Sequence, residues 1–253
     1  MTDYIYGYHV LKVALENVPK HIKKLYLLEK RHDKRVEEII GLAKQRTIPI
    51  EWLPRDVLNQ KIPNVVHQGM IAACDPPETY NEEFLKKICK SHRSHVTKEL
   101  LFLILDEVQD PHNLGACLRT TNVLGANAVI VPKHRAVQLT SVVNKISSGA
   151  SFITPVVAVK NLANTLNWMK QQNIWLVGTD LNATTPLSDI DLTGNIALIL
   201  GNEGNGLRTL TRKNCDFLAY IPMQGEVSSL NISVAAGICL YETMRQRLRL
   251  GGS

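Results

Sequence analysis

Short apolar runs separated by helical patterns dominate the C-terminal part of this 253-residue chain. The clearest runs cover residues 100–105, 128–131, 174–178 and 196–200. A strand that is apolar at nearly every position is buried on both faces, which is typical of parallel sheets covered by helices. A further strand is expected at 217–221, and helices at 113–125, 140–147, 162–172, 207–214 and 232–247. This alternation predicts an α/β domain with a parallel sheet flanked by helices.

The first 75 residues predict a smaller α/β domain. Helices are expected at 8–17 and 34–45, and strands at 22–28, 48–53 and 69–74. Residues 76–98 are polar and begin with two prolines, which favours a linker containing a short helix at 82–90. We therefore expect domains at 1–75 and 99–253, joined by the linker at 76–98.

The charge distribution favours a polyanionic partner for the N-terminal part. Residues 1–98 carry 17 Lys and Arg against 12 Asp and Glu, whereas residues 99–253 carry 12 against 11. Most of the net charge of +6 therefore lies in the smaller domain, where a nucleic-acid surface is expected.

Composition and cysteine spacing exclude several classes of protein. The chain has no apolar run of membrane-spanning length and no secretory signal pattern at its start. Its five cysteines form no C-x-x-C pair, which argues against both a zinc site and a disulfide framework. These features predict a cytoplasmic protein without a metal.

Polar residues follow one of the predicted strands in the segment D-P-H-N-L-G-A-C-L-R-T at 110–120. Asn113 is expected to cap the helix that follows. Arg119 lies within an apolar stripe, so it is either a solvated surface residue or a deliberately placed cation. Taken alone, the surface reading is favoured.

A glycine-rich segment, L-I-L-G-N-E-G-N-G-L at 198–207, follows another strand. Its glycines allow the backbone to approach a ligand closely, although a plain strand-to-helix turn is equally compatible. It is neither a Walker loop nor a G-x-G-x-x-G fingerprint. Glu203 is a carboxylate with no obvious local partner.

The third segment, I-P-M-Q-G-E-V-S-S-L-N-I-S-V-A-A-G, covers residues 221–237. It places Ser228, Ser229, Asn231 and Ser233 at the start of the last helix. Capping accounts for one of these groups. The remainder favour a site that binds a polar ligand, and ligands of open α/β sheets bind where the strands end.

Together, the three segments resemble the motifs of the SpoU (TrmH-like) branch of the SPOUT methyltransferases. The resemblance covers residues 100–253. The segments I-Y-G-Y-H-V-L-K-V-A-L at 5–15 and V-H-Q-G at 66–69 extend it to bacterial enzymes that methylate a guanosine ribose in 23S ribosomal RNA.

The resemblance implies a trefoil knot in the catalytic domain, preceded by a ribosomal-protein-like RNA-binding domain. It implies methyl transfer from S-adenosylmethionine to a ribose 2′-hydroxyl, with no metal. The implied cofactor-binding residues are Gly178, Thr179, Gly201, Ile221, Met223 and Leu230. The implied catalytic residues are Asn113, Arg119, Glu203, Ser229 and Asn231, with Glu203 available to accept hydrogen bonds from Arg119.

The resemblance also implies a homodimer formed through the knotted domain, with 23S rRNA as substrate. Candidate phosphate contacts in the N-terminal domain are Lys23, Lys24, Arg31, Lys34 and Arg35, although a solvated surface explains each of them equally well. A tRNA 2′-O-methyltransferase of the same family is the closest alternative. A dehydrogenase-like enzyme would need G-x-G-x-x-G after the first strand of the sheet, and a non-catalytic RNA-binding protein would be expected to lack Arg119 or the Ser/Asn cluster.

Overall fold

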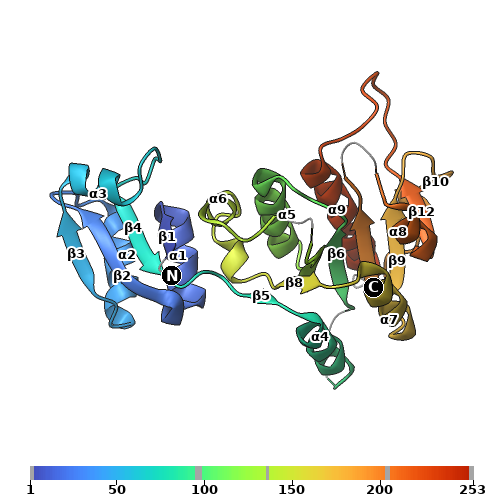
Figure 1. The fold of residues 1–253 in the computed structure, drawn as a ribbon, viewed down its shortest axis with the longest axis horizontal. Coiled ribbons are helices and arrows are strands. Elements are labelled where there is room, and N and C mark those ends of the chain that lie inside the picture. Colours follow the sequence, from blue (N-terminus) through green and yellow to red (C-terminus); the bar gives the residue numbers. More distant parts are fainter. Residues whose placement is uncertain (1–2, 95–98, 135–136, 203–205, 251–253) are drawn as a thin grey trace. The chain divides into compact units, whose positions relative to one another are not determined.

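The computed structural model describes residues 3–94, 99–134, 137–202 and 206–250 (Figure 1). The chain forms two compact units. The first consists of residues 1–78 and 138–153, and the second of residues 79–137 and 154–253.

The second unit is built on an eight-stranded sheet in which every pairing is parallel. Its strand order is β10-β12-β9-β11-β6-β7-β8-β5. In that order the strands are Thr185–Pro186, Phe217–Tyr220, Trp175–Thr179, Ile196–Leu200, Leu101–Leu105, Ala128–Pro132, Val156–Val159 and Thr79–Tyr80. The central strands β6 and β11 are buried at every position, as their unbroken apolar sequences predict. The predicted α/β class with a helix-flanked parallel sheet is confirmed.

Helices cover both faces of this sheet. Phe102 and Ile104 of β6 share a buried cluster with α4 (Glu82–Ser94) and α7 (Leu162–Gln171). On the opposite face, α5 (Pro111–Val123) packs against β7, α9 (Ile232–Leu250) packs against β11, and the two helices pack against each other. Side chains alternate between the faces of a strand, so one apolar run supplies both cores.

The start of α5 differs from the prediction that Asn113 caps it. The N-cap is Asp110, whose carboxylate accepts a hydrogen bond from the His112 N–H at 2.9 Å, and Pro111 follows at the first helical position. Proline is well suited to that position because its missing N–H needs no partner there. Asn113 is thereby moved into the helix, where it is buried. The strand β8 was not predicted, although its apolar run is as long as the one predicted at 128–131.

The first unit is a four-stranded sheet in the order β1-β4-β2-β3. Its strands are Asp3–Tyr6, Met70–Cys74, Ile22–Leu28 and Ile50–Leu53 in that order. The helices α1 (Tyr8–Asn17) and α2 (Lys34–Gln45) agree with the predicted ranges and bury a common core against the sheet. The strand β1 and the short helix α3 (Arg55–Lys61) were not predicted.

Residues 138–153 belong to the first unit by their contacts, although they lie far along the sequence. This segment contains α6 (Ser141–Ile146) and a 3-10 turn at Ala150–Phe152, and it packs against β1 and α1. Gly149 has φ +88°, and a Cβ at this position would lie 2.9 Å from Cγ1 of Val13. The close approach of the segment to α1 therefore requires glycine.

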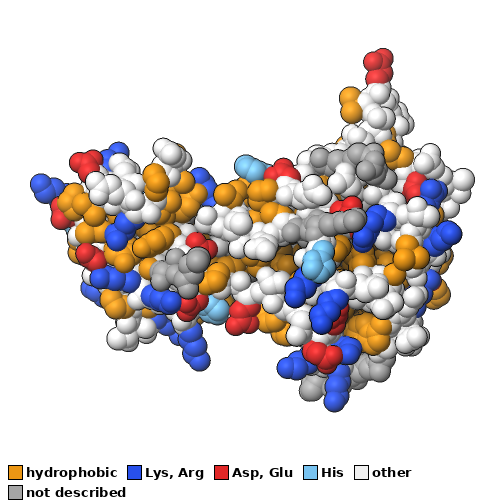
Figure 2. All heavy atoms as spheres, viewed as in Figure 1, with side chains coloured by type: hydrophobic (Ala, Val, Ile, Leu, Met, Phe, Trp, Pro, Cys, Tyr) orange, Lys and Arg blue, Asp and Glu red, His pale blue; other side chains and the backbone are white. Residues whose placement is uncertain are grey.

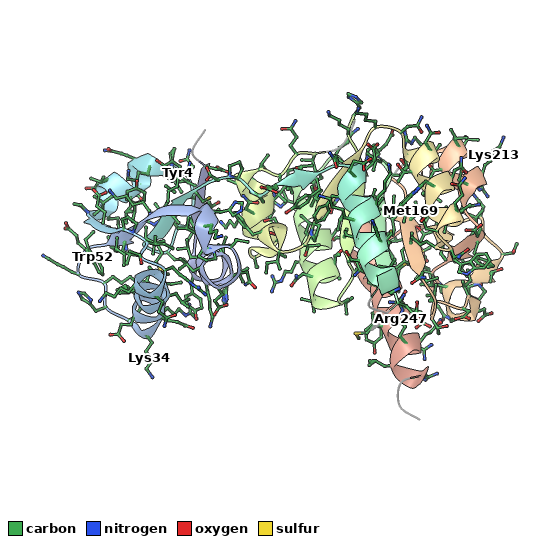
Figure 3. The ribbon with its side chains drawn as sticks, turned by 90° about the horizontal axis from the view of Figure 1, so that it is seen from below. Tyr4, Lys34, Trp52, Met169, Lys213 and Arg247 are labelled. Atoms are coloured by element: carbon green, nitrogen blue, oxygen red, sulfur yellow. The ribbon has the colours of Figure 1, made fainter. Side chains whose placement is uncertain are left out.

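Arg247 ties the end of α9 to the amino ends of two strands (Figure 3). Its guanidinium donates to the carbonyl oxygens of Glu99 at 2.9 Å, Leu100 at 2.9 Å and Gly194 at 2.7 Å. Burial lowers the pKa of this guanidinium from its ordinary value, which reflects the loss of hydration that these carbonyls replace.

We expect Arg247→Met to lower the free energy of unfolding by about 1–3 kcal/mol, because it removes the charged hydrogen bonds that hold the end of α9 to three backbone carbonyls. Urea denaturation measures this change. Arg249→Ala, at an exposed position two residues later, is the matched control and should shift stability by less than about 0.5 kcal/mol. Equal stabilities of the two variants would contradict a structural role for Arg247.

Candidate active site

A cavity of about 300 Å³ lies where β9, β11 and β12 end, at the carboxyl edge of the sheet. Thr179 and Asp180 line it from the end of β9, and Leu200 and Gly201 from the end of β11. The chain between β12 and α9, which projects as a long loop in Figure 1, supplies the opposite wall. Ligands of parallel α/β sheets bind at this edge.

Five of the six predicted cofactor-binding residues line this cavity: Thr179, Gly201, Ile221, Met223 and Leu230. Gly178 does not line it. A Cβ on Gly178 would lie 2.6 Å from Sγ of Cys215 and 2.7 Å from Cδ1 of Leu207, so this glycine allows close packing within the core.

Gly201 is placed where two backbone segments almost touch. A Cβ on Gly201 would lie 2.0 Å from the carbonyl carbon of Gly206 and 2.3 Å from the nitrogen of Leu207. Asn202 and Gly206 exchange two backbone hydrogen bonds, of 3.0 and 2.9 Å, which close the turn. Glu203 lies within 203–205, outside the described residues.

Asn231 joins the predicted polar segments at residues 110–120 and 221–237. Its Oδ1 accepts hydrogen bonds from the N–H and the hydroxyl of Ser233, as a helix cap does. Its Nδ2 donates to Oδ1 of Asn113 at 2.9 Å, across 118 positions of sequence. The structure thus brings together two of the predicted catalytic residues. Ser229, a third, lines the cavity nearby.

Arg119 occupies a different position. It is exposed on α5, and it is not among the described residues that line the cavity. Within the described parts of the chain, no carboxylate forms an ion pair with its guanidinium. Its predicted pairing with Glu203 falls outside the described residues.

Two charged residues of the cavity wall were not selected from the sequence. Nε of Arg212 lies 2.9 Å from Oδ2 of Asp180, and both side chains line the cavity. Oδ1 of Asp180 also accepts a hydrogen bond from the Asn182 N–H at 2.8 Å. Asp180 could have been selected from the sequence, because it follows a predicted strand, where ligands of parallel sheets bind.

Four of the five predicted phosphate-binding side chains have partners within the first unit. Lys23 pairs with Asp75 at 2.5 Å, Lys24 with Glu51 at 2.7 Å, and Arg31 with Asp33 at 2.6 Å. The guanidinium of Arg35 lies 5.3 Å from the ring centroid of Tyr8. Lys34 extends outward from the start of α2 (Figure 3). Exposed pairs of this kind are weak, so the lysines could exchange their partners for phosphate.

Residues 100–241 match the SpoU rRNA Methylase family, and residues 4–80 match the family described as RNA 2′-O ribose methyltransferase substrate binding. The chain belongs to the SpoU rRNA Methylase family. The predicted family is therefore confirmed, and the three polar segments all fall within the match.

Curated relatives match the SpoU chain over nearly its whole length. The 23S rRNA (guanosine-2′-O-)-methyltransferase RlmB of Coxiella burnetii is 47% identical, covering 96% of this chain and 95% of the relative. RlmB of Escherichia coli K12 is 43% identical, covering 98% and 100%.

Solved structures extend the comparison to a bound cofactor. The SpoU methyltransferase AviRb from Streptomyces viridochromogenes, in complex with AdoMet, superposes with a TM-score of 0.78 at 26% identity. That match covers 97% of this chain and 90% of AviRb. A TrmH/SpoU tRNA modifying enzyme from A. aeolicus is 29% identical with a TM-score of 0.56, and it covers 66% of this chain and 86% of its own.

The described residues contain neither a metal-binding cluster nor a membrane-spanning helix. Among the described residues, no group of three or more His, Cys, Asp or Glu side chains is arranged to hold a metal ion. In the same parts of the chain, none of the helices combines the length and hydropathy that a bilayer span requires.

Proposed function

We propose that this SpoU protein transfers a methyl group from S-adenosylmethionine to the ribose 2′-hydroxyl of a guanosine in the peptidyl-transferase region of 23S rRNA, and so contributes to ribosome maturation. The observation that carries the proposal is the cavity at the ends of β9, β11 and β12, whose walls are formed by the motifs shared with the family. Similarity to the RlmB enzymes over the whole chain supports the choice of substrate.

The chemistry of the cavity fits the cofactor. Ile221, Met223 and Leu230 provide apolar walls suited to an adenine, and the adjoining backbone offers hydrogen bonds. The Asp180 carboxylate could accept hydrogen bonds from hydroxyl or ammonium groups of the ligand. Bound S-adenosylmethionine supplies an electrophilic methyl group, so the protein must mainly hold the 2′-hydroxyl in line with it.

The residues around the Asn113–Asn231 pair would hold the reacting ribose. The hydrogen bond between these amides fixes the start of α9 against α5, and Ser229 is held just before that junction. Arg119 would act as a cation that stabilises the developing alkoxide or the neighbouring phosphate. A guanidinium is essentially never deprotonated in proteins, which argues against its use as a general base.

A homodimer would explain why Arg119 lies apart from the cavity of its own chain. The helices α5 and α9, which pack together, expose the apolar side chains of Val123, Val234, Ile238 and Tyr241. Exposed apolar side chains on neighbouring helices favour an interface between two copies. In such a dimer, Arg119 would serve the cofactor cavity of the partner, and the knotted domain would form the interface.

We expect two inactive variants to restore activity to each other when they are refolded together. Arg119→Ala would remove the arginine, and Leu230→Trp would block the cavity. In an equimolar mixture about half of the dimers are mixed, and each has one intact site, so about a quarter of wild-type activity should return. Methyl transfer in the mixture measures this. A mixture as inactive as its components would contradict a site shared between two chains.

The proposed RNA-binding domain at 1–75 lies in the first unit, and the proposed catalytic domain at 99–253 supplies most of the second. Of the predicted linker at 76–98, β5 and α4 belong to the second unit. The tRNA alternative is less well supported, because the matched tRNA modifying enzyme covers only 66% of this chain.

We also propose a cytoplasmic location, because all five cysteines are free thiols and the proposed substrate is ribosomal RNA.

The deciding experiment maps 2′-O-methylation in rRNA and tRNA from cells that lack the gene. We expect one guanosine mark in 23S rRNA to disappear and to return with the wild-type gene but not with Arg119→Ala. Loss of a tRNA mark, with rRNA unchanged, would favour the tRNA enzyme instead. If no ribose mark is lost, the proposed activity is wrong.

A further inference from the structure

A second cavity, of about 280 Å³, lies on the catalytic unit and shares no lining residue with the first. It is formed by the chain after β7, the start of α7 and the start of α8 (Thr209–Asn214). Three basic side chains from these separate segments line it: His134, Lys160 and Arg208. Figure 2 shows several Lys and Arg side chains gathered on the face of this unit that is turned to the viewer.

Arg208 is held firmly at this cavity. Its Nη2 lies 2.5 Å from Oδ1 of Asp106, whose side chain is completely buried, and its Nη1 lies 3.3 Å from Oε1 of Glu107. Its Nε is buried and has no hydrogen-bond partner among the described residues. The two carboxylates offset the charge of Arg208 and fix its direction.

Lys160 supplies a further positive charge, and His134 supplies hydrogen-bonding capacity. Both are exposed, and within the described residues neither forms an ion pair with a carboxylate. The backbone of Lys160 is anchored, because its N–H donates to Oε1 of Glu82 at 2.7 Å. The first turn of α7, which also lines the cavity, contains no acidic residue. A cavity with these walls favours an anion.

We propose that this basic cavity holds a backbone phosphate of the RNA substrate. The inference rests on the proposed function and adds a phosphate site on the catalytic unit to the phosphate contacts proposed for the N-terminal unit. The short helix α8 and the residues before it border both cavities: Leu207 and Arg212 line the first, and Arg208 and Thr211 line the second. A nucleic acid carries a phosphate at every nucleotide, so a strand whose ribose is held near the first cavity offers phosphates to the second.

The test compares RNA binding by wild-type protein, Lys160→Ala and Lys213→Ala, with unmodified 23S rRNA as the probe. Lys213 is exposed on α8 outside the cavity lining, so its replacement removes the same charge elsewhere on the unit. We expect Lys160→Ala to weaken RNA binding roughly 5- to 10-fold and to reduce the slope of log K against log salt by about 0.7–0.9, the loss of one phosphate contact. The Kd of S-adenosylmethionine should not change.

Lys160→Glu should weaken RNA binding further than Lys160→Ala, because it adds repulsion. If wild type methylates the RNA but Lys160→Ala has the slope and affinity of Lys213→Ala, the inference is overturned while the proposed function stands. If wild type methylates no RNA, the proposed function fails, and the inference fails with it. A loss of cofactor affinity in Lys160→Ala would also overturn the inference, since it would place Lys160 in the first site.

Discussion

Arg119→Ala is expected to lower kcat for RNA methylation by at least about 100-fold, the usual effect of removing a group that stabilises charge in a transition state. The Kd of S-adenosylmethionine should stay within about twofold, because the proposed role of Arg119 is to stabilise charge on the ribose oxygen or the neighbouring phosphate, not to bind the cofactor. Single-turnover methylation and calorimetric titration with the cofactor measure the two quantities separately.

A conservative variant distinguishes the possible roles of Arg119. Arg119→Lys keeps the charge but loses the planar fork, so an electrostatic role predicts activity between those of Arg119→Ala and wild type. Arg249→Ala, at another exposed arginine, should retain full activity. A near-normal kcat in Arg119→Ala would show that Arg119 takes no part in catalysis.

Gly201→Ala is expected to abolish measurable cofactor binding. The added methyl group would lie 2.0 Å and 2.2 Å from the carbonyl carbon and oxygen of Gly206. Those atoms are backbone and cannot rotate away, so the turn that closes the cavity must open. We expect at least about a 100-fold increase in the Kd of S-adenosylmethionine, because a cavity wall is displaced.

The matched control for this change is Gly194→Ala, at a glycine whose added Cβ would meet nothing within 4 Å. It should bind cofactor as wild type does. Circular dichroism would establish that Gly201→Ala keeps the sheet, since the turn lies at its edge. Cofactor affinity unchanged in folded Gly201→Ala would show that the close approach of Gly201 and Gly206 is not needed for binding.

Elements with a strong hydrophobic period could be predicted from the sequence, and those without one could not. The runs that became β6 and β11 are apolar throughout because helices cover both faces of the sheet. Residues 156–159 form a largely buried strand that was missed, whereas the equally short apolar run at 128–131 was predicted, so a run of this length does not by itself separate a strand from a helix. Two-residue strands such as β10 are defined only by their pairing with a neighbouring strand, so the local sequence does not indicate them.

The candidate site was predicted through its motifs, and its geometry needed the fold. The expected cap at Asn113 was wrong because Asp110 and Pro111 already provide a complete helix start. The sequence around Asn113 does not indicate that its side chain accepts a hydrogen bond from Asn231, 118 positions away. The basic cavity is a similar case, because His134, Lys160 and Arg208 are far apart in the sequence and each resembles an ordinary surface residue.

The return of residues 138–153 to the first unit limits how this protein can be divided. The chain passes between the units three times, after residues 78, 137 and 153, so no single cut separates them. A fragment ending near residue 80 would lack α6 and the turn at Gly149, and it would expose Val13 and the face of β1 that they cover. A portable version of the first unit therefore needs residues 138–153 joined back to residues 1–78 by a designed linker.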